Sequence, residues 1–275
     1  MEFLGKWLAD LCAKAEHMIG TCGGGMDQAC EILAEDGAAL RIDFNPLTTR
    51  LVKLPGNALF VVLHSGDYLN KASSSQYNER VIECRVAAQF LGKFLELPNW
   101  KSMRRLREIQ EKSGKTLEEL LQLVKTVIPE NVTAEEVIAE IGKDSLTALL
   151  TENTKHMKEF NLRPRASHCF GEAKRVNDFE EACKREDLTA MGQLMNQSHK
   201  SLQENYQNTS PGIDKLINEC KKANVLGVRM TGGGWGGCLV ALLDKNNPID
   251  LSQLNVLFNS SPCQGITFEE LYDQK

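Results

Sequence analysis

A glycine-rich stretch between two apolar runs most strongly limits what this chain can fold into. It is Met230-Thr-Gly-Gly-Gly-Trp-Gly-Gly-Cys238, and it follows a short, mostly apolar segment that begins at residue 225 and precedes the apolar residues 239–243. Apolar runs on both sides of a glycine cluster predict a strand, a loop and a second strand. Five glycines around one tryptophan exceed the one or two that an ordinary hairpin needs. In the alternative interpretation this is a tight turn whose Trp235 fills the core; the spacing matches neither the Rossmann nor the Walker pattern.

A second glycine run, within residues 20–25, precedes a predicted helix at 26–34. Consecutive glycines let backbone N–H groups approach a ligand closely, and a helix start adds the positive end of a dipole, so this run suits an anionic ligand. Asp27 could act there as a base on a hydroxyl nucleophile, while Gln28 and the loop amides hold the acceptor. In the alternative interpretation Asp27 only caps the helix, because Asp is favoured at that position.

The first part of the chain mixes helical and extended patterns. Residues 2–18 carry apolar side chains at helical spacing, which predicts an amphipathic helix that leads into the first glycine run. Residues 39–44 and 48–54 flank an Asn-Pro pair and predict a hairpin. The run at 58–63 is the most strand-like in the chain.

From Tyr77 to about Cys220 the pattern is almost wholly helical. Predicted helices at 116–126 and 133–141 each begin with Thr and carry Glu two or three residues later, and a further helix opens at Pro211. His168 and His199 have apolar neighbours at helical spacing, which indicates packing or capping rather than catalysis. Strands and helices, then helices, then a strand and a glycine loop predict an α+β fold.

Composition excludes several classes of protein. Of the 275 residues, 42% are apolar, which is enough for a core. A net charge of −5 and a pI of about 5.7 argue against a general nucleic-acid or membrane surface. Nine cysteines without a Cys-x-x-Cys pair or metal-ligand spacing indicate reduced thiols, no metal site and a cytoplasmic protein. No apolar run approaches 18 residues, and charges interrupt the first helix, so we expect neither a membrane span nor a signal peptide.

Four segments together resemble, in the same order, the galactokinase branch of the GHMP kinases, with details most similar to N-acetylgalactosamine kinase. They are Gly23-Gly-Gly-Met-Asp-Gln28, Tyr77-Asn-Glu-Arg-Val-Ile-Glu-Cys-Arg85, Met195-Asn-Gln-Ser-His199 and Thr231-Gly-Gly-Gly-Trp-Gly-Gly-Cys238. The resemblance runs from about residue 8 to about residue 245. The family's Gly-Glu-His-x-Asp substrate run and its Gly-Leu-Ser-Ser-Ser phosphate loop occur nowhere in the sequence. The chain therefore resembles the latter part of such a kinase, truncated at its N-terminus.

The resemblance implies an ATP-dependent sugar 1-kinase that moves the γ-phosphoryl group of ATP to the anomeric hydroxyl of galactose or N-acetylgalactosamine, with Mg²⁺ between the phosphates. It implies that Asp27 is catalytic, that Gly24 and Tyr77 contact the sugar, and that Gly233 and Gly234 brace the phosphate loop. It assigns no metal ligand to this chain. N-acetylgalactosamine kinases tend to have Phe where this chain has Tyr77, so both sugars stay open.

The resemblance also implies a domain division. Residues 1–55 would be the remnant of the N-terminal domain with the Asp27 loop, and residues 56–275 the C-terminal domain with the glycine-rich loop. We expect a monomer whose partners are sugar and ATP, with no nucleic acid and no membrane. Residues 249–275 lack the glycine-rich final strand that the family would place there.

We expect this chain alone to have little or no kinase activity. In the family, the Arg that stabilises the transferring phosphate and the Ser that meets Mg²⁺ lie in the absent part, and losing one such group typically costs about two to three orders of magnitude in rate. One alternative is a non-catalytic, galactokinase-like sensor that binds sugar and nucleotide. Another is an incomplete gene sequence of an active kinase.

Overall fold

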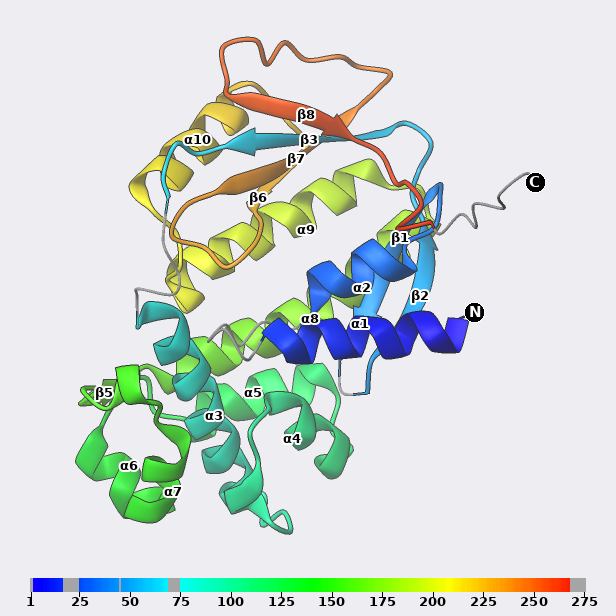
Figure 1. The fold of residues 1–275 in the computed structure, drawn as a ribbon. Helices are drawn as coiled ribbons and strands as arrows, with labels where there is room; N and C mark the ends of the chain where they lie inside the picture. The colour runs from blue at the N-terminus through cyan, green and yellow to red at the C-terminus, as the bar shows by residue number, and fades with distance from the viewer. Residues whose placement is uncertain (1, 17–24, 45, 69–74, 268–275) are drawn as a thin grey trace.

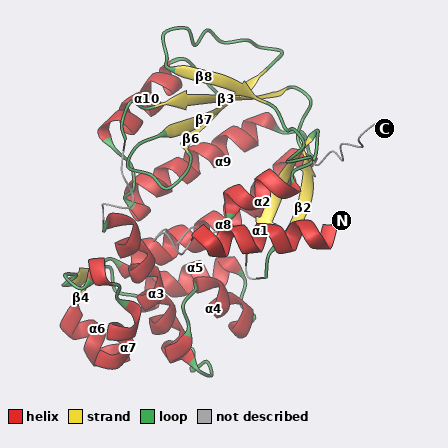
Figure 2. Ribbon diagram, in the orientation of Figure 1, coloured by secondary structure: helices red, strands yellow, loops and turns green. Residues whose placement is uncertain are grey.

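The structure, a computed structural model, describes residues 2–16, 25–44, 46–68 and 75–267. It contains a four-stranded sheet, a cluster of helices, and two N-terminal helices beside a two-stranded hairpin (Figure 1). Figure 2 shows the four-stranded sheet at the top of the view and the helical cluster below it. The predicted α+β fold is confirmed.

The elements have the following bounds. The strands are β1 (Ala38–Asp43), β2 (Thr48–Lys53), β3 (Ala58–His64), β4 (Val132–Thr133), β5 (Glu159–Phe160), β6 (Gly227–Met230), β7 (Cys238–Asp244) and β8 (Val256–Ser260). The α-helices are α1 (Glu2–Glu16), α2 (Met26–Leu33), α3 (Gln76–Phe94), α4 (Leu106–Ser113), α5 (Leu117–Val127), α6 (Ala134–Ile141), α7 (Lys143–Leu149), α8 (Leu162–Lys184), α9 (Leu188–Ser201) and α10 (Pro211–Lys222). Leu202–Tyr206 continues α9 as a π-helical segment.

The large sheet has the strand order β6-β7-β3-β8, and each neighbouring pair is antiparallel. Alternate residues of its strands face opposite sides, so the sheet contributes to two cores. Val61 and Leu239 face α10, where they pack with Ile213. Leu242 faces the other side and packs with Met191 of α9. The sheet is therefore covered by helices on both faces, and this explains why β3 is apolar from Ala58 to Leu63.

The helical cluster has a core of its own, built from α3 to α8. It includes Ile82, Ile109, Leu120 and Phe170, all of which are fully or nearly fully buried. The predicted caps of α5 and α6 are present, because Thr116 and Thr133 each form a capping box with the Glu three residues later. The 23-residue α8 belongs to two cores, since its first half packs in this cluster and its last turns pack with α9 beneath the sheet.

The N-terminal part packs on the end of α8. The hairpin strands β1 and β2 pair antiparallel from Ala38 opposite Lys53 to Asp43 opposite Thr48, which confirms the predicted hairpin. α1 and α2 lie side by side (Figure 1), and Trp7 remains 55% exposed on α1. The division of the chain at residue 55 stays a prediction.

The chain returns to the sheet near its C-terminus. β8 pairs antiparallel with β3 and forms an edge of the sheet. It contains no glycine, so residues 249–275 do supply a final strand, although not the glycine-rich one that the family resemblance led us to look for. Side chains on β8 are mostly exposed, which explains why the sequence shows no clear alternation there.

Within the described residues, none of the helices combines the length and apolarity that crossing a membrane requires.

Candidate functional site

Gly25 brings the start of α2 against α1. It is the N-cap residue of α2, and its φ of 81° lies in the left-handed region that favours glycine. A Cβ atom on Gly25 would lie 2.7 Å from the Cβ atom of Ala13 on α1, closer than such atoms approach. The glycine is thus required both by its backbone conformation and by the close helix–helix contact. Gly24, expected to contact a sugar, lies outside the described residues.

Asp27 lies in the first turn of α2 and is exposed. The N-cap position belongs to Gly25 and has no side-chain cap bond, so the alternative that Asp27 caps this helix is wrong. The helix dipole stabilises a carboxylate at this place. The negative charge of Asp27 acts on its surroundings: burial, then Asp27 and then Glu31 raise the pKa of the Cys30 thiol. Asp27 therefore offers an open carboxylate at a helix start.

The glycine loop, residues 231–237, connects β6 to β7 through a series of left-handed conformations. Positive φ values occur at Gly232, Gly234, Trp235 and Gly237, and at 56° Trp235 is a non-glycine residue in this region. Trp235 is half-buried, and its ring centroid lies 5.8 Å from the guanidinium carbon of Arg80 on α3. This arrangement argues against the alternative of an ordinary turn whose Trp235 fills the core.

Asn208 holds one side of the glycine loop. Its backbone oxygen accepts a hydrogen bond of 2.6 Å from the Trp235 amide, and its side-chain amide donates to the Gly233 oxygen at 3.2 Å. A Cβ atom on Gly234 would lie 2.3 Å from the Asn208 backbone oxygen. Only glycine allows the two segments to approach this closely.

Asp67 holds the other side of the loop. Its backbone oxygen accepts from the Gly237 amide at 2.9 Å. Its carboxylate accepts from the Ser210 hydroxyl at 2.6 Å and from the Gly212 amide at 2.8 Å, at the start of α10. The hydrogen bond from Ser210, followed by that from Gly212, lowers the pKa of Asp67. Asp67 thus ties the glycine loop to a helix N-terminus and stays ionised.

Arg80 connects the glycine loop to the helix that carries Tyr77. Its Nε atom donates to the backbone oxygen of Tyr206 at 2.8 Å, and its Nη2 atom donates to that of Gln207 at 3.3 Å. Tyr77 is half-buried and lies three residues earlier on α3, so the two side chains project from the same face of the helix. Asp67, Arg80 and Asn208 were not assigned a role from the sequence, because no local pattern marks a residue that contacts a loop far away in the chain.

The predicted residues come from three elements. Tyr77, Gly233 and Gly234 are linked through Arg80 and Trp235. In the view of Figure 1 the start of α2, the start of α3 and the glycine loop lie at mid-height, between the sheet and helices α4 to α7. Asp27 is on the first of these elements, so the fold places it and Tyr77 at two helix starts in this middle region.

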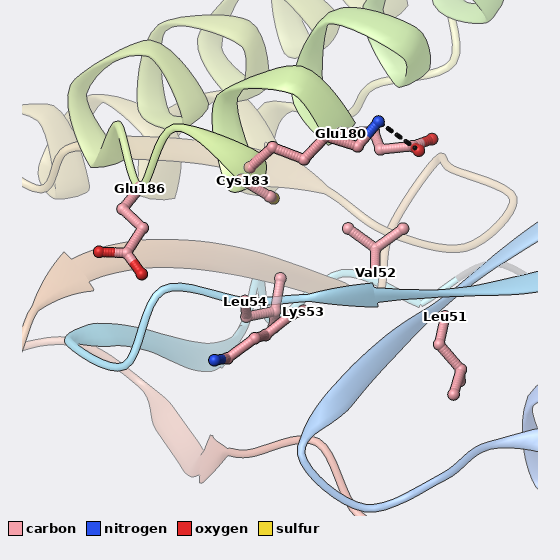
Figure 3. A pocket seen from close by; sticks show the side chains of 8 residues that line it. Leu51, Val52, Lys53, Leu54, Glu180, Cys183 and Glu186 are labelled. Atoms are coloured by element: carbon pink, nitrogen blue, oxygen red, sulfur yellow. Dashed lines mark ion pairs between the residues drawn. The ribbon is translucent and has the colours of Figure 1, made fainter.

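A separate cavity of about 150 Å³ lies between the hairpin and the end of α8 (Figure 3). Its lining includes Leu54, Glu180 and Cys183, and none of the predicted site residues. Burial alone would raise the pKa of Glu180, but hydrogen bonds from Lys184, Arg41 and Arg50 outweigh it and lower the pKa to about 2. These ion pairs fasten the hairpin to α8, so this cavity belongs to a structural contact.

A site for ATP and Mg²⁺ needs ligands for the metal ion and hydrogen-bond donors for the phosphate groups. None of their His, Cys, Asp and Glu side chains gather in groups of three or more that could hold a metal ion. The amides of Thr231, Trp235 and Gly237 donate within the protein, whereas those of Gly233 and Gly234 donate to no described residue. The glycine loop therefore has two amide donors without an acceptor among the described residues, and such donors suit a phosphate group.

Comparison with known proteins shows that the chain is similar to kinases. Residues 179–253 match the family of GHMP kinases, C terminal. A galactokinase of Dictyostelium discoideum is 35% identical over 271 residues, an alignment that covers 88% of this chain and 54% of that protein. A galactokinase of Bos taurus is 34% identical over 240 residues, covering 86% of this chain and 49% of that protein.

A solved structure agrees with these relatives. The crystal structure of Lactococcus lactis galactokinase complexed with galactose matches 87% of this chain and 51% of its own, with a TM-score of 0.62 and 28% identity. Residues 179–253, which include the glycine loop, are thus similar to the C-terminal part of GHMP kinases. The relatives and the solved structure that the chain is similar to are galactokinases. It spans about half the length of the curated relatives it matches.

Proposed function

We propose that this chain is part of an ATP-dependent sugar 1-kinase that phosphorylates galactose or N-acetylgalactosamine at the anomeric hydroxyl. The observation that carries the proposal is the match of 87% of the chain to a galactokinase solved with galactose. The exposed carboxylate of Asp27 adds to it, and so do the amides of Gly233 and Gly234, which have no acceptor among the described residues. Both are chemical groups that a phosphoryl transfer needs.

In this proposal Asp27 receives the proton of the anomeric hydroxyl as that oxygen attacks the γ-phosphorus. Its exposure at the start of α2 leaves the carboxylate accessible to a hydroxyl. Gly24 and Tyr77 contact the sugar and orient it. The amides of Gly233 and Gly234 face the phosphate groups, where backbone N–H donors stabilise negative charge.

ATP supplies the phosphoryl group and Mg²⁺ neutralises its developing charge. The chain's own contribution is a rigid platform. Asp67 and Asn208 bind the glycine loop from two sides. Arg80 holds the loop against the helix that carries Tyr77. Such preorganisation matters because groups that must reorient during the reaction stabilise the transition state less. A cytoplasmic monomer remains part of the proposal.

We further propose that the isolated chain has little or no turnover. Neither the Gly-Glu-His-x-Asp run nor the serine-rich phosphate loop is in its sequence. The first test is a thermal melt of the purified chain with and without Mg-ATP and each of the two sugars. A ligand at 100 times its Kd stabilises a protein by about 2.7 kcal/mol, which would raise the Tm by several degrees.

Turnover is then measured as ADP release, with Asp27→Asn as the matched control. A ligand-dependent Tm without ADP release supports a binding site in a chain with impaired catalysis, or the non-catalytic sensor. ADP release that Asp27→Asn abolishes supports the kinase and refutes the impairment. A Tm that responds to neither sugar nor Mg-ATP refutes a surviving site in this chain.

A further inference from the structure

Two cysteines from distant parts of the chain meet between the long helices of the helical cluster. Cys84 lies on α3 and Cys169 lies on α8, 85 residues later. Their sulfur atoms are 3.6 Å apart, which is a direct contact between two thiols. Both residues are half-buried, and both pack against the core of the cluster. Their meeting is therefore fixed by the packing of α3 on α8 rather than by a flexible surface loop.

We propose that Cys84 and Cys169 form a reversible disulfide when the protein meets a peroxide or a comparable thiol oxidant. A disulfide has a sulfur–sulfur bond of about 2.05 Å, so the two sulfur atoms need to approach by only about 1.5 Å from their present separation of 3.6 Å. Side-chain rotation supplies movements of this size. The proposal does not depend on the proposed kinase activity.

The reaction with hydrogen peroxide balances without any further reactant. One thiolate attacks a peroxide oxygen, which breaks the O–O bond and gives a sulfenic acid and, after proton uptake, water. The second thiol then displaces the hydroxyl of the sulfenic acid, forms the S–S bond and releases a second water. Two thiols lose two electrons and two protons, and one peroxide becomes two molecules of water.

The surroundings of the pair make this oxidation slow and conditional. The hydrogen bond with Cys169, followed by burial, raises the pKa of Cys84 well above its ordinary value. Because the thiolate is the reacting form, little of Cys84 is reactive at neutral pH. In a reducing compartment the pair therefore stays as two thiols, and a disulfide accumulates only under added oxidant.

The cross-link would join the helix that carries Tyr77 and Arg80 to the helix that spans both cores. The ring of Tyr206 lies 4.6 Å, centroid to centroid, from the ring of His168, which precedes Cys169 on α8. The backbone oxygen of Tyr206 is the acceptor for Arg80. Oxidation would thus restrain the segment that holds Arg80 and, through it, the glycine loop.

The test maps the disulfide in the whole purified chain. The protein is treated with hydrogen peroxide, quenched with catalase, unfolded in N-ethylmaleimide and digested with trypsin. Cleavage after Arg80 and Arg85 isolates Cys84 in a five-residue peptide, and cleavage after Arg165 and Lys174 isolates Cys169 in a nine-residue peptide. We expect these two peptides joined, with the mass of two hydrogens lost, and separated again by dithiothreitol. We also expect the oxidised protein to melt roughly 5 to 10 °C higher, because the link closes a long loop.

The control variants separate this pair from general oxidation. Cys84→Ser and Cys169→Ser must each lose the joined peptides, whereas Cys30→Ser and Cys263→Ser, at exposed positions, must keep them. The proposal is overturned if peroxide modifies Cys30 and Cys263 while both peptides of the pair still take up N-ethylmaleimide. It is equally overturned if Cys84 or Cys169 is found joined mainly to another cysteine.

Discussion

The buried ion pair between Glu83 and Arg165 gives the sharpest test of how the helical cluster is held together. Arg165 is fully buried and Glu83 is 2% exposed. The Nε atom of Arg165 donates to a Glu83 carboxylate oxygen at 2.6 Å, and its Nη2 atom donates to the Gln207 side chain at 3.0 Å. The other Glu83 oxygen accepts from the Asn161 amide at 2.9 Å. α3 and α8 are thus joined to the segment after α9 through one guanidinium.

We predict that Arg165→Met lowers the free energy of unfolding by about 3 to 5 kcal/mol, because it removes the 2.6 Å ion pair of a buried carboxylate and leaves Glu83 only the Asn161 amide and a longer, 3.5 Å contact with Arg80. In a protein of this size that corresponds to a fall in Tm of roughly 6 to 15 °C. The free energy is measured by urea unfolding followed by circular dichroism. The matched control is Lys200→Met, which breaks the exposed ion pair between Lys200 on α9 and Glu204 in the π-helical segment and should cost less than about 1 kcal/mol.

A double variant completes the test. Glu83→Met together with Arg165→Met removes both charges, so its loss of stability should be smaller than the sum of the two single losses. Equal losses for Arg165→Met and Lys200→Met would refute the reasoning, and so would strict additivity of the two substitutions in the buried pair.

Three further predictions concern other contacts. Gly234→Ala should destabilise the chain by about 1 to 3 kcal/mol more than Gly232→Ala, because both have positive φ but only Gly234 would place a Cβ atom against another backbone; similar urea midpoints would contradict this. Burial lowers the pKa of His168 to about 4, so unfolding takes up a proton below pH 6.5. The free energy of unfolding therefore decreases as the pH falls from 6.5 to 4, because only the unfolded chain carries the protonated histidine in this range. His168→Asn should therefore reduce the loss of stability between pH 7 and pH 5 by about 2 kcal/mol, and parallel pH profiles would rule this out. Glu180→Gln should speed hydrogen exchange in β1 and β2 but not in β3, whereas the exposed Glu181→Gln should change neither.

Local patterns in the sequence predicted the elements that local chemistry determines. The caps of α5 and α6 are set by residues within one turn, and the hairpin of β1 and β2 by two extended runs around a turn. The strand–loop–strand around the glycine loop was predicted for the same reason. The resemblance to galactokinases added the order of motifs and the expectation that they form one kinase fold.

The parts that the sequence did not predict depend on long-range contacts. Asp67 reaches Ser210 and the glycine loop across more than 140 residues, and no spacing along the chain encodes that meeting. β8 was not predicted because an edge strand with exposed side chains needs no alternation of apolar residues. The roles of Asp27, Tyr77, Gly233 and Gly234 remain predictions, since position alone does not show chemistry.

The order of strands in the sheet has a consequence for synthesis on the ribosome. β3 is made early, yet β7, β6 and β8 follow only after the whole helical cluster; Asn57, next to β3, bonds Asp244 at the end of β7, 187 residues away. At roughly 5 to 20 residues per second, the strand waits about 10 to 40 seconds for its first neighbour. During that time an apolar strand with two open edges is exposed to other nascent chains. Production of the chain should thus depend on chaperones that shield β3 until β7 emerges.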